Sequence, residues 1–107
     1  MLVNLVSNAL EAAPVGGFIL VDARALNINS RRLVRITVAD NGPGISTAVR
    51  GRIFEPFFTT KSERGTGLGL YISDEIVRKH GGRIRLRSST RAGASGSVFH
   101  VILPIRA

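Results

Sequence analysis

The stretch GTGLGLYISDEIVRKHGG, residues 65–82, places alternating glycines directly before an expected helix. The first amide groups of a helix have no partner within it and carry a partial positive charge. Glycines before such an end allow the backbone to curl its amides around an anion. Gly65, Gly67 and Gly69, together with Thr66, therefore form a candidate phosphate cradle. Taken alone, the stretch fits equally well a glycine loop that packs against the helix.

The glycine stretch matches neither of two common phosphate-binding motifs. The dinucleotide-binding fingerprint would need a preceding strand and glycine at position 70, where this chain has Leu70. A Walker A loop would need lysine and then serine or threonine after the glycines. Lys61 and Arg64 lie just before the glycines and could neutralise phosphate charge.

An amphipathic helix is expected at the start of the chain, ending before Pro14. Its apolar face repeats at helical spacing and consists of Leu2, Leu5, Val6, Ala9, Leu10 and Ala13. Its opposite face is polar and consists of Asn4, Ser7, Asn8 and Glu11. A solvated helix face is the simpler interpretation. Amide and carboxylate oxygens also suit Mg²⁺, however, and a neutral amide can hold the metal without repelling bound phosphates.

The sequence DNGPGI, residues 40–45, follows an expected strand. Asn-Gly is a strong hairpin signal, but the residues after it indicate a short helix with Ser46 as its N-cap. The functional interpretation is a carboxylate at a strand end, followed by glycines that let a flat ligand approach the backbone. Asp40 could accept a hydrogen bond from the exocyclic amine of adenine, whereas guanine presents a carbonyl oxygen there. The motif therefore favours an adenine nucleotide.

The expected order of elements is helix, two strands, short helix, loop, helix and two strands. Residues 17–27 and 31–40 alternate with period two, as do residues 83–89 and 97–105, and a second long helix covers about residues 68–79. This order predicts an α/β two-layer sandwich, with helices on one face of a mixed or antiparallel sheet.

Composition restricts the possible classes of protein. The 107 residues suffice for one domain, and the absence of cysteine excludes a disulfide framework and a thiolate metal site. No apolar stretch is long enough for a transmembrane helix, and no signal peptide is visible. Fifteen basic residues against seven acidic ones give a net charge of +8, which attracts polyanions. The polyanion could be nucleic acid, a phosphorylated small molecule, an anionic membrane or an acidic protein.

The phenylalanine-rich segment FEPFFTTK, residues 54–61, carries Phe54, Phe57 and Phe58. Such a cluster is most often part of a core. Beside a glycine-rich segment, it could instead anchor a lid that excludes water when ligand binds.

The segments NLVSNALEA, DNGPGI, FEPFFTTK and GTGLGL resemble, in order and spacing, the four boxes of the histidine-kinase ATP-binding domain. This family belongs to the GHKL superfamily. The closing segment HGGRIRLRSS…GSVFHVILP is also similar to the family's last strands. The close spacing of the third and fourth boxes resembles the nitrogen-regulation and oxygen-sensing branch. The resemblance implies a Bergerat fold, in which ATP lies between the helices and a mixed sheet.

The resemblance also implies roles for individual residues. Asn8 matches the Mg²⁺-binding asparagine, and Asn4 and Lys61 are the expected catalytic residues near the phosphates. Asp40 matches the aspartate that reads adenine, and Ser97 replaces a threonine common in the family. The expected nucleotide contacts are Asn4, Asn8, Ala12, Asp40, Gly42, Gly44, Ile45, Lys61, Arg64, Gly65, Thr66, Gly67, Leu68, Gly69 and Ser97.

As the resemblance implies, the reaction is transfer of the γ-phosphoryl group of Mg·ATP to a histidine on a separate dimerisation domain. A response regulator is the next expected partner, and the expected location is the cytoplasm. We expect residues 1–107 to form one partial domain that lacks the family's first strands and the start of its first helix. The isolated chain should then not phosphorylate itself, because His80 and His100 occupy a helix end and a strand. An unpaired sheet edge could join two copies.

Three alternatives stay open. An anti-sigma-type serine kinase of the same superfamily is the nearest, although such relatives usually carry a carboxylate where this chain has Asn4. A basic nucleic-acid-binding module would explain the charge, but aromatic residues are only 6% and cluster in one loop, so no nucleic acid is expected. A domain that binds nucleotide without turnover is the third.

Overall fold

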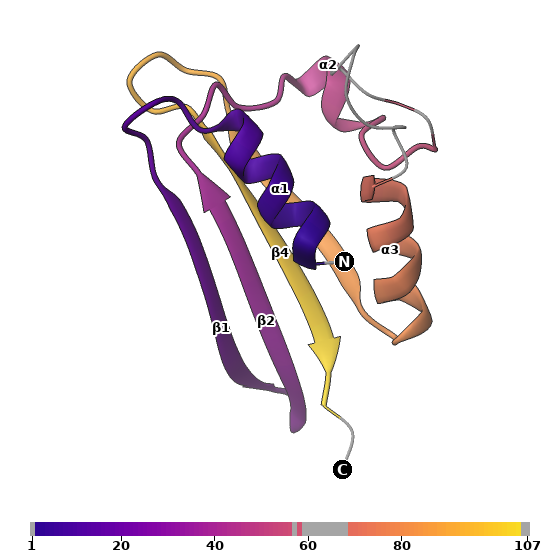
Figure 1. Ribbon diagram of the computed structural model, residues 1–107. Helices are drawn as coiled ribbons and strands as arrows, with labels where there is room; N and C mark the ends of the chain where they lie inside the picture. Colours follow the sequence, from indigo (N-terminus) through magenta and orange to yellow (C-terminus); the bar gives the residue numbers. More distant parts are fainter. Residues whose placement is uncertain (1, 57, 59–68, 106–107) are drawn as a thin grey trace.

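The computed structural model describes residues 2–56, 58 and 69–105. The helices and strands in these residues are α1 (Leu2–Ala12), β1 (Ile19–Ile28), β2 (Arg31–Asp40), α2 (Thr47–Arg50), α3 (Gly69–Lys79), β3 (Arg83–Ser89) and β4 (Gly96–Pro104). The expected order of elements is confirmed. The main difference in bounds is α2, which is shorter than the predicted helix. Figure 1 shows α1 and α3 on the same face of the sheet.

The described strands form one sheet in the order β1-β2-β4-β3. Every neighbouring pair among them is antiparallel. The predicted two-layer sandwich is confirmed. The sequence allowed either a mixed or an antiparallel sheet, and the described strands form an antiparallel one. The central strands are β2 and β4, and α1 packs mainly against β2.

A two-residue turn joins β1 to β2. Ile28 pairs with Arg31, and both turn residues, Asn29 and Ser30, have positive φ values of 51° and 66°. Positive φ at both central positions is the geometry of a type I′ turn, whose twist matches that of the flanking strands. The turn therefore fixes the register along the whole hairpin.

The core lies between the sheet and the two longer helices. Its buried apolar residues are Leu5, Ala9, Val38, Ile53, Val77, Phe99 and Val101. Leu5 and Ala9 come from the predicted apolar face of α1, but Leu10 of that face is 64% exposed. Helix α1 contacts mainly β2 and only a short part of β1, so Leu10 projects beyond the covered part of the sheet.

The two ends of the segment between β2 and β3 are stabilised differently. At the end of α3, Gly81 has φ 79° and Gly82 donates a hydrogen bond to the Val77 carbonyl at 2.9 Å, as in a Schellman motif. At the start of α2, Ser46 is the N-cap residue, but its side chain makes no capping hydrogen bond. Its carbonyl oxygen accepts from the amides of Val49 and Arg50 instead.

Candidate nucleotide-binding site

Asn4 of α1 lies against the first turn of α3. Its Nδ2 donates to the carbonyl oxygen of Gly69 at 3.4 Å and to Oγ of Ser73 at 3.5 Å, both near the long limit for a hydrogen bond. Ser73 Oγ itself donates to the Gly69 carbonyl at 2.8 Å. The polar flank of the first helix and the helix that follows the glycine stretch thus meet in space. Figure 1 shows the start of α1 near α3.

Asp40 lies at the end of β2 and is only 7% exposed. Its Oδ1 accepts a hydrogen bond from the Gly42 amide at 2.9 Å. Among the described residues, no donor bonds to its second oxygen, Oδ2. A buried strand-end carboxylate with one oxygen available is the arrangement expected for recognition of an amino group.

The glycines that follow Asp40 pack closely against other elements. A Cβ atom on Gly42 would collide with the Ala12 carbonyl oxygen at the end of α1. Gly44 has φ 80°, and a Cβ atom there would collide with the Ser89 carbonyl oxygen at the end of β3. Packing within the protein therefore requires glycine at both positions, whether or not a ligand is bound. From the sequence alone, we expected glycine there so that a flat ligand could approach the backbone.

A hydrogen-bond network behind Asp40 fixes the direction of the Ser97 hydroxyl. Ser97 is 5% exposed and pairs with Asp40 across the sheet. Ser88 Oγ donates to the Gly96 carbonyl at 2.9 Å and lies 2.8 Å from Ser97 Oγ. Since a hydroxyl has one proton, Ser97 donates to Ser88. The Ser97 oxygen is left to act as an acceptor, next to the Asp40 carboxylate.

Arg50 and Ser88 were not among the residues expected from the sequence. Ser88 Oγ accepts from the Ile45 amide at 2.7 Å. Arg50 donates from Nε to the Ile45 carbonyl at 3.0 Å and from Nη2 to the Ser88 carbonyl at 2.7 Å. The register of the last two strands could have indicated Ser88, which pairs with Ser97. Nothing in the local sequence marks Arg50.

The described site residues fall into two groups. Around the end of β2 lie Ala12, Asp40, Gly42, Gly44, Ile45 and Ser97. On the flank of α1 and the first turn of α3 lie Asn4, Asn8 and Gly69. Asn4 and Asn8 are half-buried and one helical turn apart. Lys61, Arg64, Gly65, Thr66, Gly67 and Leu68 lie outside the described residues, so their roles stay predictions.

Two of the three clustered phenylalanines pack against the core. Phe54 meets Phe99 of β4 edge to face, with ring centroids 6.4 Å apart. Phe58 also packs against the core, and the Arg52 guanidinium lies 4.7 Å from its ring centroid. The core interpretation is confirmed for this pair, whereas Phe57 lies outside the described residues. Phe54 and Phe58 thus attach the start of the segment between α2 and α3 to the sheet.

The chemistry of the described residues fits a magnesium–phosphate complex better than a metal held by protein alone. In residues 2–56, 58 and 69–105, no group of three or more histidine, cysteine, aspartate or glutamate side chains could hold a metal ion. Mg²⁺ usually keeps several waters and binds through one or two protein oxygens plus substrate phosphates. The Asn8 amide oxygen would suit that role.

In residues 2–56, 58 and 69–105, no helix has the length and apolar character needed to cross a bilayer.

Comparison with known proteins places these features in a family. A sequence model described as histidine kinase-, DNA gyrase B- and HSP90-like ATPase matches residues 1–107. Sporulation kinase E of Bacillus subtilis is 42% identical over 104 residues, 97% of this chain and 13% of that protein. The C4-dicarboxylate transport sensor protein DctB of Rhizobium meliloti is 45% identical over 103 residues, 96% of this chain and 16% of that protein. The chain thus spans less than a fifth of the length of these relatives.

Solved structures give the same assignment. The mycobacterial sensor histidine kinase MprB superposes with a TM-score of 0.78 and 35% identity, covering 94% of this chain and 67% of that one. Full-length ShkA in complex with AMPPNP superposes with a TM-score of 0.79 and 32% identity, covering 99% of this chain and 21% of that one. Both identities are high enough to support relationship as well as a common fold.

Proposed function

Since the chain belongs to the family of histidine kinase-, DNA gyrase B- and HSP90-like ATPases, we propose that it positions Mg·ATP for phosphoryl transfer within a sensor histidine kinase. The chain is an ATP-binding domain of the histidine-kinase type, as its four motifs predicted. Because it spans only 13% of sporulation kinase E, the activity and partners of the whole protein are part of the proposal.

The observation that carries the proposal is the pair of acceptors at the end of β2. Asp40 offers Oδ2, and Ser97, whose proton is directed to Ser88, offers its oxygen. Two adjacent acceptors favour a base edge that donates hydrogen bonds. The exocyclic amine of adenine has two N–H groups, whereas a guanine carbonyl at that position would face acceptors. The described geometry therefore supports adenine as the base.

The triphosphate would extend from this pocket toward the flank of α1 and the start of α3. Asn4 and Asn8 lie on that flank, and the amides of the first turn of α3 offer partial positive charge. Mg²⁺ bound through Asn8 would neutralise charge on the phosphates. Lys61, Arg64 and the glycine loop would add to this neutralisation. In phosphoryl transfer, positioning and charge neutralisation supply most of the catalysis.

The phosphoryl acceptor in this proposal is a histidine of a separate dimerisation domain. His80 follows the last turn of α3, and a helix of 11 residues is about 16 Å long, so His80 lies far from Asn4. His100 lies on β4, on the face of the sheet opposite Asp40. A response regulator would then receive the phosphoryl group. The location in this proposal is the cytoplasm, where ATP is available, and it is compatible with a membrane anchor elsewhere in the parent protein.

Association of two copies through β1 is a further part of the proposal. β1 is an edge strand among the described elements, since only β2 pairs with it. It is ten residues long and exposes Leu20, Val21 and Ile28 by about half of their surfaces. A long, apolar edge strand favours pairing with another strand.

Calorimetric titration with Mg·ADP and Mg·GDP tests the nucleotide site. Asp40→Asn keeps an oxygen for the Gly42 amide but replaces the other acceptor by an amide donor, so we expect Mg·ADP affinity to fall at least tenfold. Asp22→Asn, on the opposite face of the sheet, is the matched control and should bind as the wild type does. Equal affinity of Asp40→Asn and the wild type for Mg·ADP, or preference of the wild type for Mg·GDP, would refute this site.

A further inference from the structure

The face of the sheet opposite the helices carries arginines that are aligned across the strands. Side chains alternate between faces along a strand. Since Phe99 and Val101 of β4 face the helices, His100 and Ile102 face the other way. Strand pairing forms one row of Arg24, Arg35, Ile102 and Arg83 and a second row of Asp22, Thr37, His100 and Arg85. Arg87 lies beside Val98 in the next row. We call this surface the open face.

A hollow opens on the open face. It has a volume of about 530 Å³ and is lined by Arg35, Arg85, Leu86, Arg87, His100 and Ile102. Small-molecule sites in proteins span about 300–1,000 Å³, so the hollow is large enough for a ligand. Asp40 is on the helix side of β2, two residues from buried Val38. The hollow is therefore separate from the nucleotide site.

Within the part of the chain that the structure describes, the arginines that line the hollow have no charged partners. Arg24 bonds to Asp22 at 3.1 Å, but among the described residues no ion pair involves Arg35, Arg83, Arg85 or Arg87. The Nε of Arg35 is buried and has no hydrogen-bond partner there. Arg35 also lies directly opposite Arg24 in the β1–β2 ladder, where like charges destabilise the pairing. An anion that accepted from Arg35 would satisfy this donor and offset the repulsion.

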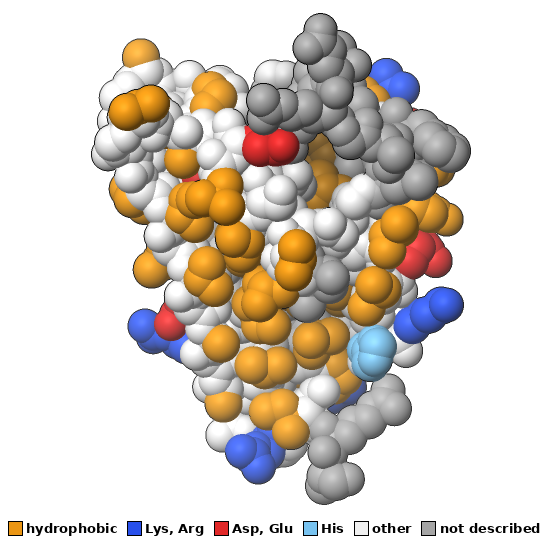
Figure 2. Space-filling view, viewed as in Figure 1, with side chains coloured by type: hydrophobic (Ala, Val, Ile, Leu, Met, Phe, Trp, Pro, Cys, Tyr) orange, Lys and Arg blue, Asp and Glu red, His pale blue; other side chains and the backbone are white. Residues whose placement is uncertain are grey.

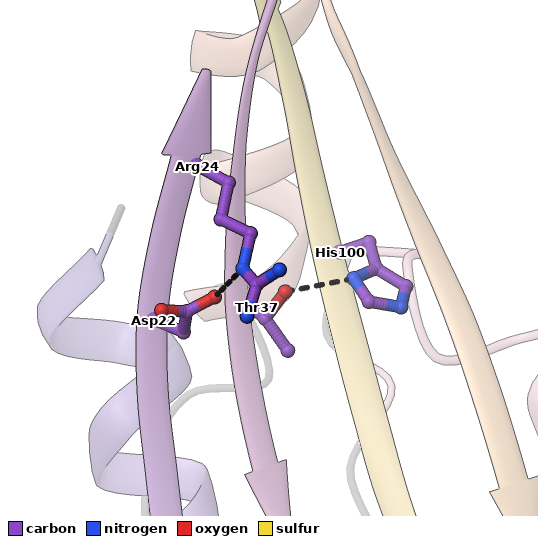
Figure 3. Close-up of polar contacts among 4 residues, drawn as sticks. All are labelled: Asp22, Arg24, Thr37 and His100. Carbon is purple, nitrogen blue, oxygen red and sulfur yellow. Dashed lines mark hydrogen bonds and ion pairs between the residues drawn. The ribbon is translucent and has the colours of Figure 1, made fainter. Parts of the chain in front are cut away.

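His100 lies in the middle of this charge distribution. Its Nδ1 is 3.0 Å from Thr37 Oγ1, and Figure 3 shows both side chains on the same face as Asp22 and Arg24. Partial burial, reinforced by the positive charges of Arg35 and Arg87, lowers the pKa of His100 below its ordinary value. An anion held between these groups would reverse the effect of the arginines. The imidazole would then take up a proton more readily and could add a charged donor.

We propose that the hollow on the open face is a binding site for a small molecule that carries two or more linked phosphate groups. Guanidinium groups bind phosphate oxygens in a bidentate geometry. Neighbouring side chains on one face lie roughly 5 Å apart across strands and about 7 Å apart along a strand, which matches several oxyanions better than one. One carboxylate carries a single negative charge and could neutralise only one of Arg35, Arg85 and Arg87. A molecule with linked phosphate groups carries several negative charges, so it could pair with several of these arginines within the hollow of about 530 Å³.

Nuclear magnetic resonance of the two histidines provides a direct test, because His80, which follows α3, is a built-in reference. The intact chain is titrated with inorganic tripolyphosphate, without Mg²⁺ and at constant ionic strength. We expect a saturable shift of the His100 imidazole signals and an increase in the His100 pKa, with little change at His80. Arg87→Gln should weaken the His100 response at least tenfold, as should Arg85→Gln. Arg78→Gln should not, because Arg78 pairs with Asp74 on α3.

The nucleotide site could itself bind tripolyphosphate, so a second set of variants separates the two sites. Asn8→Ala, on the proposed phosphate side of that site, and Asp40→Asn, on its base side, should both leave the response of His100 unchanged, which keeps this test independent of the proposed function. A response that chloride or sulfate reproduces at equal ionic strength would overturn the proposal. So would the same affinity in Arg87→Gln and Arg85→Gln, if their amide spectra show the native fold. Tighter binding of oligoglutamate, or binding of phosphatidylserine vesicles without a tripolyphosphate response, would also overturn it.

Discussion

Asp40 combines a structural and a binding role in one side chain. Oδ1 closes the turn by accepting from the Gly42 amide, while Oδ2 is left for a ligand. The sequence indicated that the carboxylate and the glycines belong to a site. The Asn-Gly pair is a hairpin signal, but a helix and not a second strand follows it. It could not indicate why the glycines are required. Their nearest atoms belong to Ala12 and Ser89, which are distant in the chain.

The steric environment of Gly44 gives a prediction about stability. Gly44→Ala places a Cβ atom against the Ser89 carbonyl and forces alanine to adopt φ 80°, so unfolding free energy should fall by about 1–3 kcal/mol or more. Gly51→Ala is the matched control, since φ there is −68° and no atom lies near the new Cβ. It should be neutral or stabilise by up to about 1 kcal/mol. Urea unfolding of both variants measures the difference, and equal stabilities would contradict the described turn.

The position of His100 predicts an effect of pH on stability. The pKa of His100 is lowered in the folded state by burial and by Arg35 and Arg87, while Asp22 and Arg85 complete its row. As pH falls below about 6.5, the unfolded chain therefore takes up a proton before the folded chain does. Stability should decrease from that pH down to the lowered pKa, and this loss should be absent above pH 7.

Urea unfolding between pH 7.5 and pH 5 checks this loss of stability. His100→Gln should reduce the pH dependence, because it removes the titrating group from the hydrogen bond with Thr37. His80→Gln should retain it. Parallel curves for the wild type and His100→Gln would show that another group is responsible.

At the scale of elements, α2 is held by its neighbours more than by its own capping. Arg50 joins the Ile45 carbonyl before α2 to the Ser88 carbonyl on β3. Ser88 in turn accepts from the Ile45 amide and from Ser97. A four-residue helix cannot be stable by itself. The turn after Asp40 thus depends on a side chain that lies outside the recognised motif.

Substitution of Arg50 tests this dependence. Arg50→Ala removes two charged donors and leaves the Ser88 and Ile45 carbonyls without them, so we expect a loss of about 1.5–3 kcal/mol in unfolding free energy. Mg·ADP affinity should fall as well, because the Asp40 turn loses its support. Arg78→Ala removes an exposed helix pair with Asp74 and should cost no more than about 0.5 kcal/mol. If the two variants lose similar stability, Arg50 does not hold the turn.

Elements were predictable from the sequence where the signal is local. Period-two alternation indicated the strands, and the apolar repeat that ends before Pro14 indicated α1. The rotation of α1 over the sheet was not predictable, and Leu10 is exposed although it belongs to the apolar repeat. The contacts of Ser88 and Arg50 also depend on pairing between distant strands. Local periodicity carries no information about such contacts.

At the scale of the whole molecule, the sheet separates two kinds of chemistry. The helix side carries the Asp40 and Asn4 groups, whereas the open face carries Arg24, Arg35 and the arginines of β3. The net charge of +8 was visible in the composition, but the alignment of these arginines on one face follows from strand register. Figure 2, viewed from the helix side, shows mainly apolar side chains over the middle of the molecule. The aligned arginines of the open face therefore lie on the side of the sheet away from the proposed nucleotide site.

The exposed apolar surface on the helix side bears on association of the whole molecule. Val3 and Leu10 of α1 are 79% and 64% exposed, and Val21 of β1 is 49% exposed. Because β1 pairs only with β2 among the described strands, a second copy could add to its free edge and cover this surface. Sedimentation velocity from about 5 to 500 µM, which covers dissociation constants in the micromolar range, should then show concentration-dependent dimers. Val21→Lys should weaken the dimer, since a lysine on an edge strand opposes pairing.

Ile72→Lys is the matched control for that prediction. Ile72 is similarly exposed, at 43%, but lies on α3 and not on the sheet edge. The added charge is the same, so a general effect of charge repulsion would weaken association equally in both variants. A specific edge contact would weaken it only in Val21→Lys. Amide hydrogen exchange provides the structural readout, because strand pairing in the dimer should protect the outward-facing amides of β1. A wild type that is monomeric at every concentration would exclude the contact.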